Sequence, residues 1–466
     1  MSLIKICLIL ILSIVYIPHG EGERVLVVTP IGTKSHKIFL MGISEALTKK
    51  GHHVTMVSAF EPDKERENIR EVIIRNYTVD YLLKKAFEQT GTFTKFYFIS
   101  TKACIDGLKQ EHIQDLKKEK FDVIIMSVFF DYCYFSLIHH FKVPYVYASP
   151  LGIVTPYHKM VGNIDVPSIS GSLLSEPAFP ITFVKRLRTT LSNLMYTILN
   201  DYYLEPQMHS QCVKSGLCPA DMPLISEIHK NVSLILINSV KTLEKPPRPS
   251  MPNVIHSGAA FIKSPKKLPK DLGEWIDASG EEGCIYFSLG SALNPDFLPE
   301  EHLKTLLKVF GSLKQRVLWK YNKPTIPDLP KNVKLQKWLP QNDVLGHPKV
   351  KLFITHGGLL STHESVYNGV PVIGMPVFAD QYANMAAVEL EGFGRLMEWD
   401  KLEENIFRDM ILEVINSKEY EVYNMDVWAS ILLVLLLTFY ISWRVIKFIL
   451  RKCFGPKVKG SKRKKE

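Results

Sequence analysis

Short apolar runs alternate along the chain with longer segments whose apolar residues have helical spacing. An apolar run at 24–29 predicts a buried strand. Apolar residues then recur at helical spacing from about His36 to Lys50, and Gly51 ends the predicted helix. A second apolar run at 53–58 completes a β-α-β unit, which is the building block of a parallel sheet.

The same alternation continues on both sides of a proline-rich stretch. We expect 23–244 and 257–425 to form two Rossmann-like, doubly wound α/β domains joined by a linker at 245–256. Residues 155–225 should be mainly helical and irregular. Two such domains would bind a ligand between the carboxyl ends of their sheets. The further predicted strands are 121–126, 143–148, 284–288, 316–320, 333–336, 350–355 and 370–374, and the further predicted helices are 299–313, 359–368 and 381–391.

Both ends of the chain carry apolar segments. Residues 1–22 combine a lysine, an apolar run and small residues, which predicts a secretory signal peptide, with a buried first strand as the alternative. Near the other end, 427–443 is uncharged over 17 residues. If Arg444 and Lys447 reach the interface, the predicted transmembrane helix extends over 426–450, with a buried core helix as the alternative.

The net charge of +10 is concentrated at the C-terminus. From Arg444 to Glu466 there are ten Lys or Arg residues and one acid, which leaves 47 basic and 46 acidic residues elsewhere. A nucleic-acid-binding protein carries its charge on the folded face that binds, so we expect no nucleic-acid partner. The basic tail, 451–466, indicates the cytosolic side. Its end matches a dilysine retrieval signal, which predicts a single-pass type I protein of the endoplasmic reticulum membrane with a lumenal body.

Cysteines and asparagines are consistent with a lumenal body. Cys212 and Cys218 are close enough in sequence to form a small disulfide, with buried free thiols as the alternative. No cysteine belongs to a Cys-x-x-Cys pair, so no zinc site is expected. Asn76 and Asn231 each begin an Asn-x-Ser/Thr triplet and are predicted glycosylation acceptors.

The most specific chemical signal begins at Trp338. The chain runs Trp338-Leu-Pro-Gln, then Thr355-His-Gly-Gly, and later Asp380-Gln. With the residues between them, these segments closely resemble the long donor-binding signature of UDP-glycosyltransferases, and the resemblance covers nearly the whole chain. It is similar to the membrane-anchored animal members, in particular those of invertebrates. The resemblance implies the GT-B fold, in which an N-terminal acceptor-binding domain faces a C-terminal domain that binds a UDP-sugar.

Elementary chemistry agrees with the roles that the resemblance implies. A helix that begins at Gly358 after a strand presents free N–H groups and a positive dipole end to phosphate. Trp338 offers a flat face for uracil, although a single Trp after a strand is usually a core residue. By resemblance, Gln341 and Glu364 hold the ribose hydroxyls. The other donor-binding residues would contact the diphosphate (Ser288, Ser291, His356, Ser361) or the sugar (Asp380, Gln381), with Gly358 at the helix start.

His36 lies in the first turn after the first strand, where the family has its catalytic histidine. A neutral imidazole can take the proton of an acceptor hydroxyl, which contributes roughly 10²–10⁴ in rate. Relatives pair this histidine with a carboxylate, and many vertebrate members have Asp where this chain has Ser127. We therefore expect Asp131 to orient the imidazole. A histidine that only begins a helix is the alternative.

Several departures bear on cofactors and activity. The chain has no Asp-x-Asp pair, and a helix terminus with His356 can hold a diphosphate, so we expect no metal and no cofactor besides the UDP-sugar co-substrate. Leu360 stands where many relatives have Asn. The stretch between Gly394 and Asp426 is also shorter than in the family, by a few dozen residues.

The resemblance implies an inverting UDP-glycosyltransferase. It would move a hexose, glucose in preference to glucuronate, to a hydroxyl of a small lipophilic acceptor, in detoxification or metabolite conjugation. A catalytically impaired UDP-sugar-binding member, acting as a lumenal partner, is the alternative favoured by Ser127 and the shortened stretch. A receptor with an extracellular body is disfavoured by the dilysine tail. Homo- or hetero-oligomers with family members are compatible with either activity.

Overall fold

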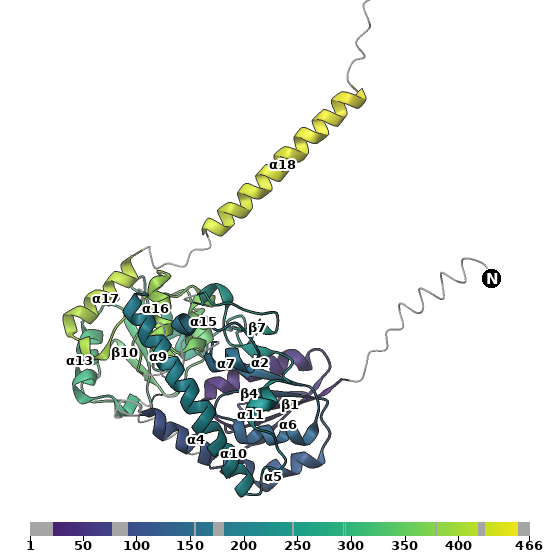
Figure 1. Cartoon of the computed structure of the whole chain (residues 1–466). Coiled ribbons are helices and arrows are strands. Elements are labelled where there is room, and N and C mark those ends of the chain that lie inside the picture. The colour runs from purple at the N-terminus through teal and green to yellow at the C-terminus, as the bar shows by residue number, and fades with distance from the viewer. Residues whose placement is uncertain are drawn as a thin grey trace, which may run out of the picture. The chain divides into compact units, whose positions relative to one another are not determined.

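The fold is built from two parallel β-sheets with helices packed on both of their faces (Figure 1). The computed structural model describes residues 22–76, 92–152, 155–170, 181–244, 247–291, 293, 295–377, 380–417 and 425–454. The predicted signal peptide, apart from Gly22, and most of the basic tail lie outside these residues. Two doubly wound parallel sheets confirm the fold class expected from the sequence.

The first sheet has seven parallel strands in the order β3-β2-β1-β4-β5-β6-β7. Successive side chains of β1 pack on opposite faces of this sheet. Leu26 and Val28 belong to one apolar cluster, and Val25 and Val27 belong to another. A parallel sheet covered on both faces needs such continuous apolar strands. The strands are β1 (Arg24–Thr29), β2 (His53–Ser58), β3 (Ile69–Ile73), β4 (Val123–Ser127), β5 (Tyr145–Ser149), β6 (Ile235–Ile237) and β7 (Val254–His256).

The second sheet has six parallel strands in the order β10-β9-β8-β11-β12-β13. Phe287 and Trp319 pack on one face against Phe310 and Phe407, while Tyr286 and Phe353 belong to the cluster on the other face. The strands are β8 (Cys284–Ser288), β9 (Arg316–Lys320), β10 (Val333–Gln336), β11 (Val350–Thr355), β12 (Val372–Gly374) and β13 (Gly394–Leu396).

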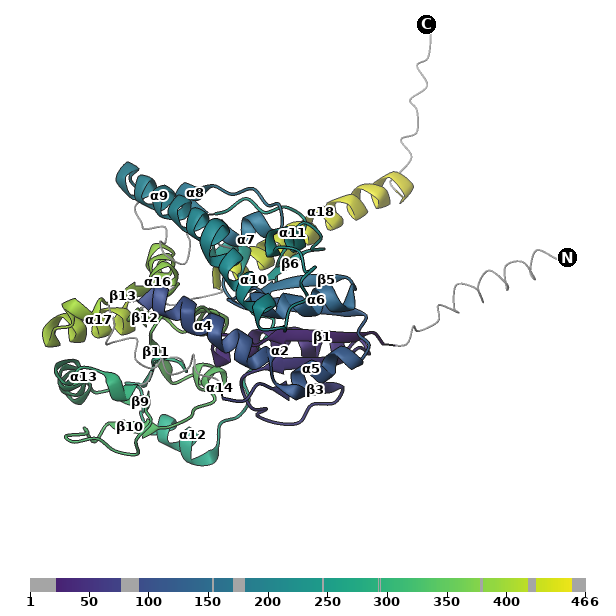
Figure 2. The same cartoon turned by 60° about the horizontal axis from the view of Figure 1, so that its bottom comes forward.

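Helices lie on both sides of the sheets (Figure 2). Phe39 and Leu40 of α2 pack on one face of the first sheet, and Cys104 of α4 and Phe135 of α6 pack on the other. The helices of the first sheet are α2 (Lys34–Thr48), α4 (Thr92–Leu108), α5 (Glu111–Gln114), α6 (Phe135–Phe141), α7 (Thr155–Met160), α8 (Pro167–Ser170), α9 (Phe183–Leu199), α10 (Glu205–Lys214) and α11 (Ile225–His229). The later helices are α12 (Lys270–Asp277), α13 (Glu300–Ser312), α14 (Gln341–Leu345), α15 (Leu359–Asn368), α16 (Gln381–Leu390), α17 (Glu404–Asn416) and α18 (Met425–Phe454).

The predicted strands at 53–58, 284–288, 316–320, 333–336 and 350–355 are confirmed at the same bounds. The sequence interpretation missed β3, β6, β7 and β13, which have three to five residues each. Strands this short give no clear apolar run, and pairing with a longer neighbour fixes them. β7 lies at the end of the stretch expected to be a linker.

Two disulfides join cysteines of the first-sheet region. Cys212 and Cys218 are bonded, which decides between the disulfide and the free thiols that the sequence had left open. A second bond, between Cys104 of α4 and Cys133 after β4, was not anticipated because 29 positions separate the two residues. Both bonds are consistent with an oxidising compartment.

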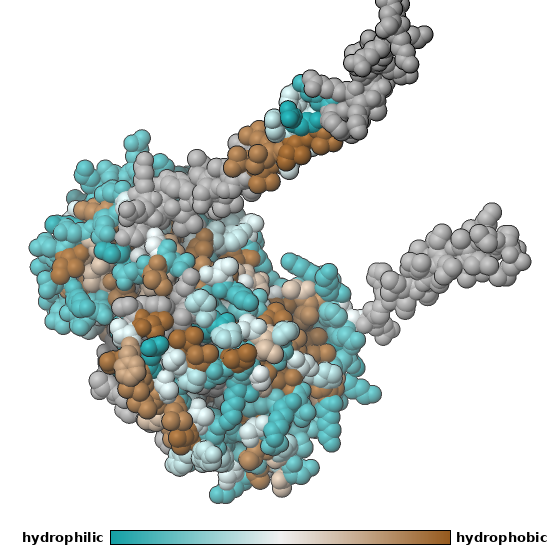
Figure 3. Space-filling view, turned by 45° about the horizontal axis from the view of Figure 1, so that its top comes forward, coloured by the Kyte–Doolittle hydropathy of each residue, from teal (hydrophilic) through white to brown (hydrophobic). Residues whose placement is uncertain are grey.

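The second compact unit comprises 421–466, and its described part is α18. The part of α18 coloured by hydropathy is largely apolar at its surface (Figure 3). Its longest uncharged run has 17 residues before Arg444 and Lys447, whereas crossing a bilayer takes about 20. Within the described residues, no helix combines the length and apolar character needed to span a membrane. The transmembrane helix predicted at 426–450 is therefore not supported.

Candidate functional site

Loops that follow strands of the two different sheets touch each other. Lys34 is the first residue of α2 and follows β1, whereas Trp338 follows β10. The Lys34 Nζ atom lies 4.1 Å from the centroid of the Trp338 ring. The carboxyl ends of the two sheets therefore face each other, which is the place where open α/β folds bind ligands.

His36 is buried in the first turn of α2, and packing holds its imidazole. The ring packs edge-on against Phe129, with 4.5 Å between the ring centroids. Among the described residues, its Nδ1 atom has no hydrogen-bond partner. Burial lowers the pKa of His36 to about 3, so the imidazole is neutral at physiological pH. A neutral imidazole is the form that can accept a proton, but the same burial weakens His36 as a base relative to a free imidazole.

Asp131 is fully buried after β4, but its carboxylate is not bonded to His36. Its Oδ1 accepts a hydrogen bond from the Ile31 N–H at 3.2 Å, and its Oδ2 accepts one from the Phe129 N–H at 3.4 Å. Burial raises the pKa of Asp131 well above its usual value. Asp131 therefore joins the loop after β1 to the loop after β4 and holds Phe129, which in turn contacts His36.

His356 occupies a slot between two glycines at the end of β11. A Cβ on Gly290 would lie 2.4 Å from Cε1 of the imidazole, and a Cβ on Gly358 would lie 2.6 Å from Nε2. The His356 Nδ1 atom lies 3.3 Å from the Thr355 hydroxyl. Burial and, to a smaller extent, the charge of Lys320 lower the pKa of His356 to about 3. A neutral His356 can donate one hydrogen bond beside the first turn of α15.

Gln341, Ser361 and Glu364 form a hydrogen-bonded group between α14 and α15. The Gln341 amide donates to the Ser361 hydroxyl at 2.9 Å and to the Glu364 carboxylate at 2.5 Å. The Tyr286 hydroxyl donates a hydrogen bond to the side-chain oxygen Oε1 of Gln341 at 3.2 Å. Burial raises the pKa of Glu364 to about 7. The structure thus brings together the two residues expected at the ribose, with Ser361 beside them.

The remaining predicted donor residues lie in neighbouring loops. The Asp380 carboxylate accepts a hydrogen bond from the Asn384 amide at 2.9 Å, and burial raises its pKa. The Gln381 side chain accepts from the Val377 N–H at 2.8 Å at the start of α16. The Ser288 hydroxyl accepts from the Gly290 N–H at 3.2 Å, whereas the Ser291 residue is exposed in the following turn.

Three further side chains of this region were not anticipated from the sequence: Lys34, Phe129 and Lys320. Lys320 ends β9, and its Nζ lies 5.1 Å from the Trp338 ring centroid. The same Nζ donates to the Gly290 carbonyl at 2.5 Å. The position of Lys320 at the carboxyl end of a predicted strand was a signal that could have identified it.

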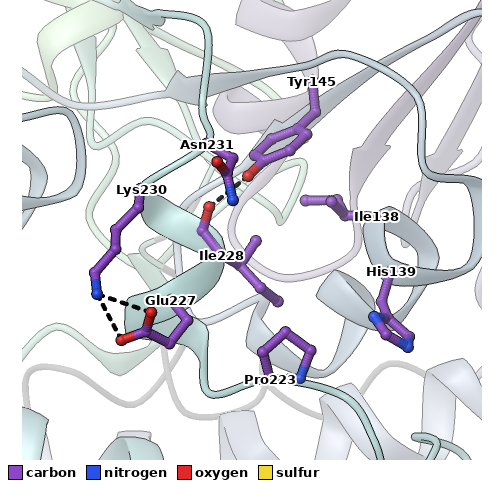
Figure 4. Close-up of a pocket in the computed structure, with 8 residues that line it drawn as sticks. All are labelled: Ile138, His139, Tyr145, Pro223, Glu227, Ile228, Lys230 and Asn231. Atoms are coloured by element: carbon purple, nitrogen blue, oxygen red, sulfur yellow. Dashed lines mark hydrogen bonds and ion pairs between the residues drawn. The ribbon is translucent and has the colours of Figure 1, made fainter.

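Other features of the described chain lie away from this region. A pocket of about 380 Å³ is lined by Tyr145 at the amino end of β5, by parts of α6 and α11, and by Asn231, a predicted glycosylation acceptor (Figure 4). Asn76 is exposed, but Thr78 of its triplet lies outside the described residues. Among those residues, no group of three or more His, Cys, Asp or Glu side chains could hold a metal ion.

Comparison with solved structures identifies the fold. The chain resembles the glycotransferase of kitacinnamycin with a TM-score of 0.57 at 17% identity, covering 86% of this chain and 92% of that one. It also resembles a UDP-glucosyltransferase from Polygonum tinctorium with a TM-score of 0.56 at 17% identity, covering 85% and 91% of the two chains. The fold is therefore that of the GT-B glycosyltransferases.

Sequence comparison identifies the family. The family model described as "UDP-glucoronosyl and UDP-glucosyl transferase" matches residues 35–432, so the chain belongs to this family of UDP-glycosyltransferases. It is 30% identical to the UDP-glycosyltransferase UGT5 of Dactylopius coccus over 87% of this chain and 79% of that protein. It is 31% identical to the human 2-hydroxyacylsphingosine 1-beta-galactosyltransferase over 86% and 75% of the two chains. These relatives confirm the family expected from the sequence.

Proposed function

We propose that the protein transfers a hexose from a UDP-sugar to a hydroxyl of a small lipophilic acceptor, with inversion at the anomeric carbon. Glucose is the proposed hexose and glucuronate the second choice. The observation that carries the proposal is the contact of Lys34 with Trp338. It brings the α2 turn with His36 against the loops that hold the expected nucleotide-binding residues.

The donor site would use groups from several loops of the second sheet. The Trp338 ring would stack on uracil, and Gln341 with Glu364 would bind the ribose hydroxyls. The first turn of α15 and His356 would bind the diphosphate, because helix N-termini present unpaired N–H groups and a positive dipole end. Ser288, Ser291 and Ser361 would add hydroxyl donors there, and Asp380 with Gln381 would bind the sugar hydroxyls. No metal is required for this arrangement.

His36 would act as the general base. Its neutral imidazole takes the proton of the acceptor hydroxyl while that oxygen attacks the anomeric carbon. The new carbon–oxygen bond forms as the bond to UDP breaks, and UDP leaves with the electron pair. Attack from the face opposite UDP converts an α-linked donor into a β-glycoside. Asp131 would support this step by holding the Phe129 loop against His36, or by bonding to the imidazolium once it forms.

Turnover with a defined donor tests this function. The purified protein should release UDP from UDP-glucose when a simple phenol is supplied, and NMR of the product should show a β-glycoside. His36→Ala should lower the rate by about 10²–10⁴ while UDP binding stays intact. Full activity of this variant would remove His36 from the proposed role.

A catalytically impaired binding protein is the second candidate function. The unpaired Nδ1 of His36 favours it, because a histidine base is normally oriented by a partner at that nitrogen, and the described residues supply none. Such a protein would act as a lumenal partner of active family members in homo- or hetero-oligomers. Such a protein would bind UDP but would release no UDP from UDP-sugars with any phenol tested. This outcome distinguishes it from a transferase.

We place the body in the lumen of the endoplasmic reticulum, where a role in detoxification or metabolite conjugation would be exercised. The Cys104–Cys133 and Cys212–Cys218 disulfides support an oxidising compartment. Glycosylation at Asn76 and Asn231 would follow from this location. A mobility shift on treatment with endoglycosidase H, lost in the double Asn→Gln variant, would test the location.

A further inference from the structure

Two ammonium groups, one from the start of α2 and one from the end of β9, converge on one indole ring. The Nζ atoms of Lys34 and Lys320 lie 4.1 Å and 5.1 Å from the centroid of the Trp338 ring. Trp338 is 57% exposed, so this ring is not a core residue. Lys34 comes from the same turn as His36, whereas Lys320 comes from the strand next to β8 and β10.

Neither cation is balanced by an acidic side chain of the described chain. Among its residues, Lys34 and Lys320 form no ion pair with a carboxylate. Burial, and secondarily the nearby charge of Lys34, lower the pKa of Lys320 to about 8. The first turn of α15 adds a positive dipole end beside His356, whose pKa the charge of Lys320 also lowers. The electrostatic potential between the Trp338 ring and the first turn of α15 is therefore positive.

The two lysines differ in how firmly they are held. Lys320 donates a hydrogen bond of 2.5 Å to the Gly290 carbonyl, in the loop that contacts the His356 imidazole. Within the described part of the chain, the Lys34 ammonium makes no hydrogen bond, and its contact is with the face of an aromatic ring. A base stacked on the Trp338 ring would compete with both ammonium groups for that ring. Lys34, on a flexible four-carbon chain, can move aside more easily.

We propose that Lys34 and Lys320 bind the diphosphate of the nucleotide, so that Lys34 reaches the donor from the opposite sheet and couples donor binding to the His36 turn. This inference rests on the proposed function and adds two residues to it. A diphosphate is the anion that fits, because it can occupy the space beside α15 while its base takes the Trp338 ring. The lysines then exchange a cation–π contact for charge-assisted hydrogen bonds, which are stronger.

The test compares ligands that differ only in the diphosphate. Calorimetric affinities of UDP and uridine would be measured for the wild type, Lys34→Met and Lys320→Met, since Met keeps the length and apolar body of the lysine stem. Each variant should bind UDP about tenfold more weakly, which corresponds to the loss of one charge-assisted hydrogen bond. Uridine affinity should stay the same or rise, because one ammonium group no longer competes for the indole.

Controls separate the ways in which the inference can fail. Lys304→Met removes an exposed lysine of α13 that pairs with Glu300 and should change neither affinity. Lys34→Arg keeps the positive charge, so this variant should bind UDP with an affinity within about threefold of the wild type. Equal losses of UDP and uridine affinity, or unchanged UDP affinity in both Met variants, would overturn the assignment. A wild-type protein that binds no UDP would instead overturn the proposed function itself.

Discussion

A Cβ atom on Gly32 would lie only 2.1 Å from Nδ1 of His36, so glycine alone fits beside this imidazole. Gly32 also has a φ of +125°, which side chains rarely adopt. The turn after β1 therefore packs closely against the His36 ring at Nδ1. The position of this proposed base depends on a glycine four residues earlier in the chain.

Gly32→Ala should accordingly impair the site without touching the substrate. The new methyl group must displace the His36 ring, and the backbone strain should cost about 1–3 kcal/mol of stability. We expect UDP-glucose turnover to fall by at least tenfold, since a small misplacement of a reacting group can cost about 10²-fold. Steady-state kinetics with a phenolic acceptor would measure the loss.

Gly51→Ala is the matched control for this substitution. Gly51 has a φ of +92°, but nothing lies within 4 Å of the place that its Cβ would take. The substitution should therefore destabilise the protein by a similar amount while turnover per folded molecule is kept. Equal turnover losses in the two variants would mean that strain, and not the position of His36, lowers the activity.

A second glycine substitution isolates His356 from backbone strain. Gly358 has an ordinary φ of −63° at the start of α15, yet a Cβ there would lie 2.6 Å from Nε2 of His356. Gly358→Ala should turn the imidazole away and weaken UDP binding by roughly tenfold, with a stability change below about 1 kcal/mol. Uridine affinity should be unaffected, because the diphosphate contact alone is changed.

Gly273→Ala, in α12, provides the comparison for Gly358→Ala. A Cβ on Gly273 would make only an ordinary contact, with Leu268 at 3.8 Å. Isothermal titration of both variants with UDP would measure the difference. If Gly358→Ala binds UDP as tightly as Gly273→Ala does, His356 does not contact the diphosphate.

The alternation of apolar segments was enough to predict the two parallel sheets. Strands buried on both faces, such as β1 and β11, are mainly apolar, with one exposed basic residue each, so their ends could be placed to the residue. Strand β6 has only three residues and is defined by pairing with β5, a contact between positions almost ninety residues apart. Such pairing is a property of the folded chain and leaves no local pattern.

The candidate site was predictable where one short segment supplies the residues. Gln341 and Glu364 lie within the signature that begins at Trp338, and they are hydrogen-bonded in the structure. The partner of His36 was harder to predict because it depends on how the loops after β1 and β4 pack. Asp131 was expected to orient the imidazole, but its bonds go to backbone N–H groups of these two loops. Loop geometry decides which donors a buried carboxylate binds, and the sequence does not express that geometry locally.

The two disulfides should differ in their contribution to stability. Cys104–Cys133 closes a loop between residues 29 positions apart, and Cys212–Cys218 closes one between residues six positions apart. By loop entropy, removing the longer bridge should cost about 3.5 kcal/mol and removing the shorter one about 2 kcal/mol. Urea unfolding of the two double Cys→Ala variants would test the order, and a larger loss for the shorter bridge would contradict it.

Glu364 should make both stability and nucleoside binding depend on pH near neutrality. Its pKa is raised by burial to about 7, from an unfolded value of 4.5, so the folded protein holds this proton more tightly. The stability that the protonated Glu364 contributes is therefore complete below pH 4.5 and is lost as the pH rises through about 7. Glu364→Gln should flatten this part of the stability profile.

Ionisation of Glu364 lowers the stability of the protein, but it should raise the affinity for uridine. An ionised Glu364 accepts hydrogen bonds from ribose hydroxyls better than the neutral acid does, so uridine affinity should rise up to roughly tenfold between about pH 6 and pH 8. Uridine is the proper probe, because Lys320 has a pKa of about 8 and its loss of charge would weaken diphosphate binding over part of this range. Titrations of the wild type and Glu364→Gln at several pH values would measure the effect. A wild-type affinity that does not change with pH would place Glu364 away from the ribose, since no other group assigned to the nucleoside titrates in this window.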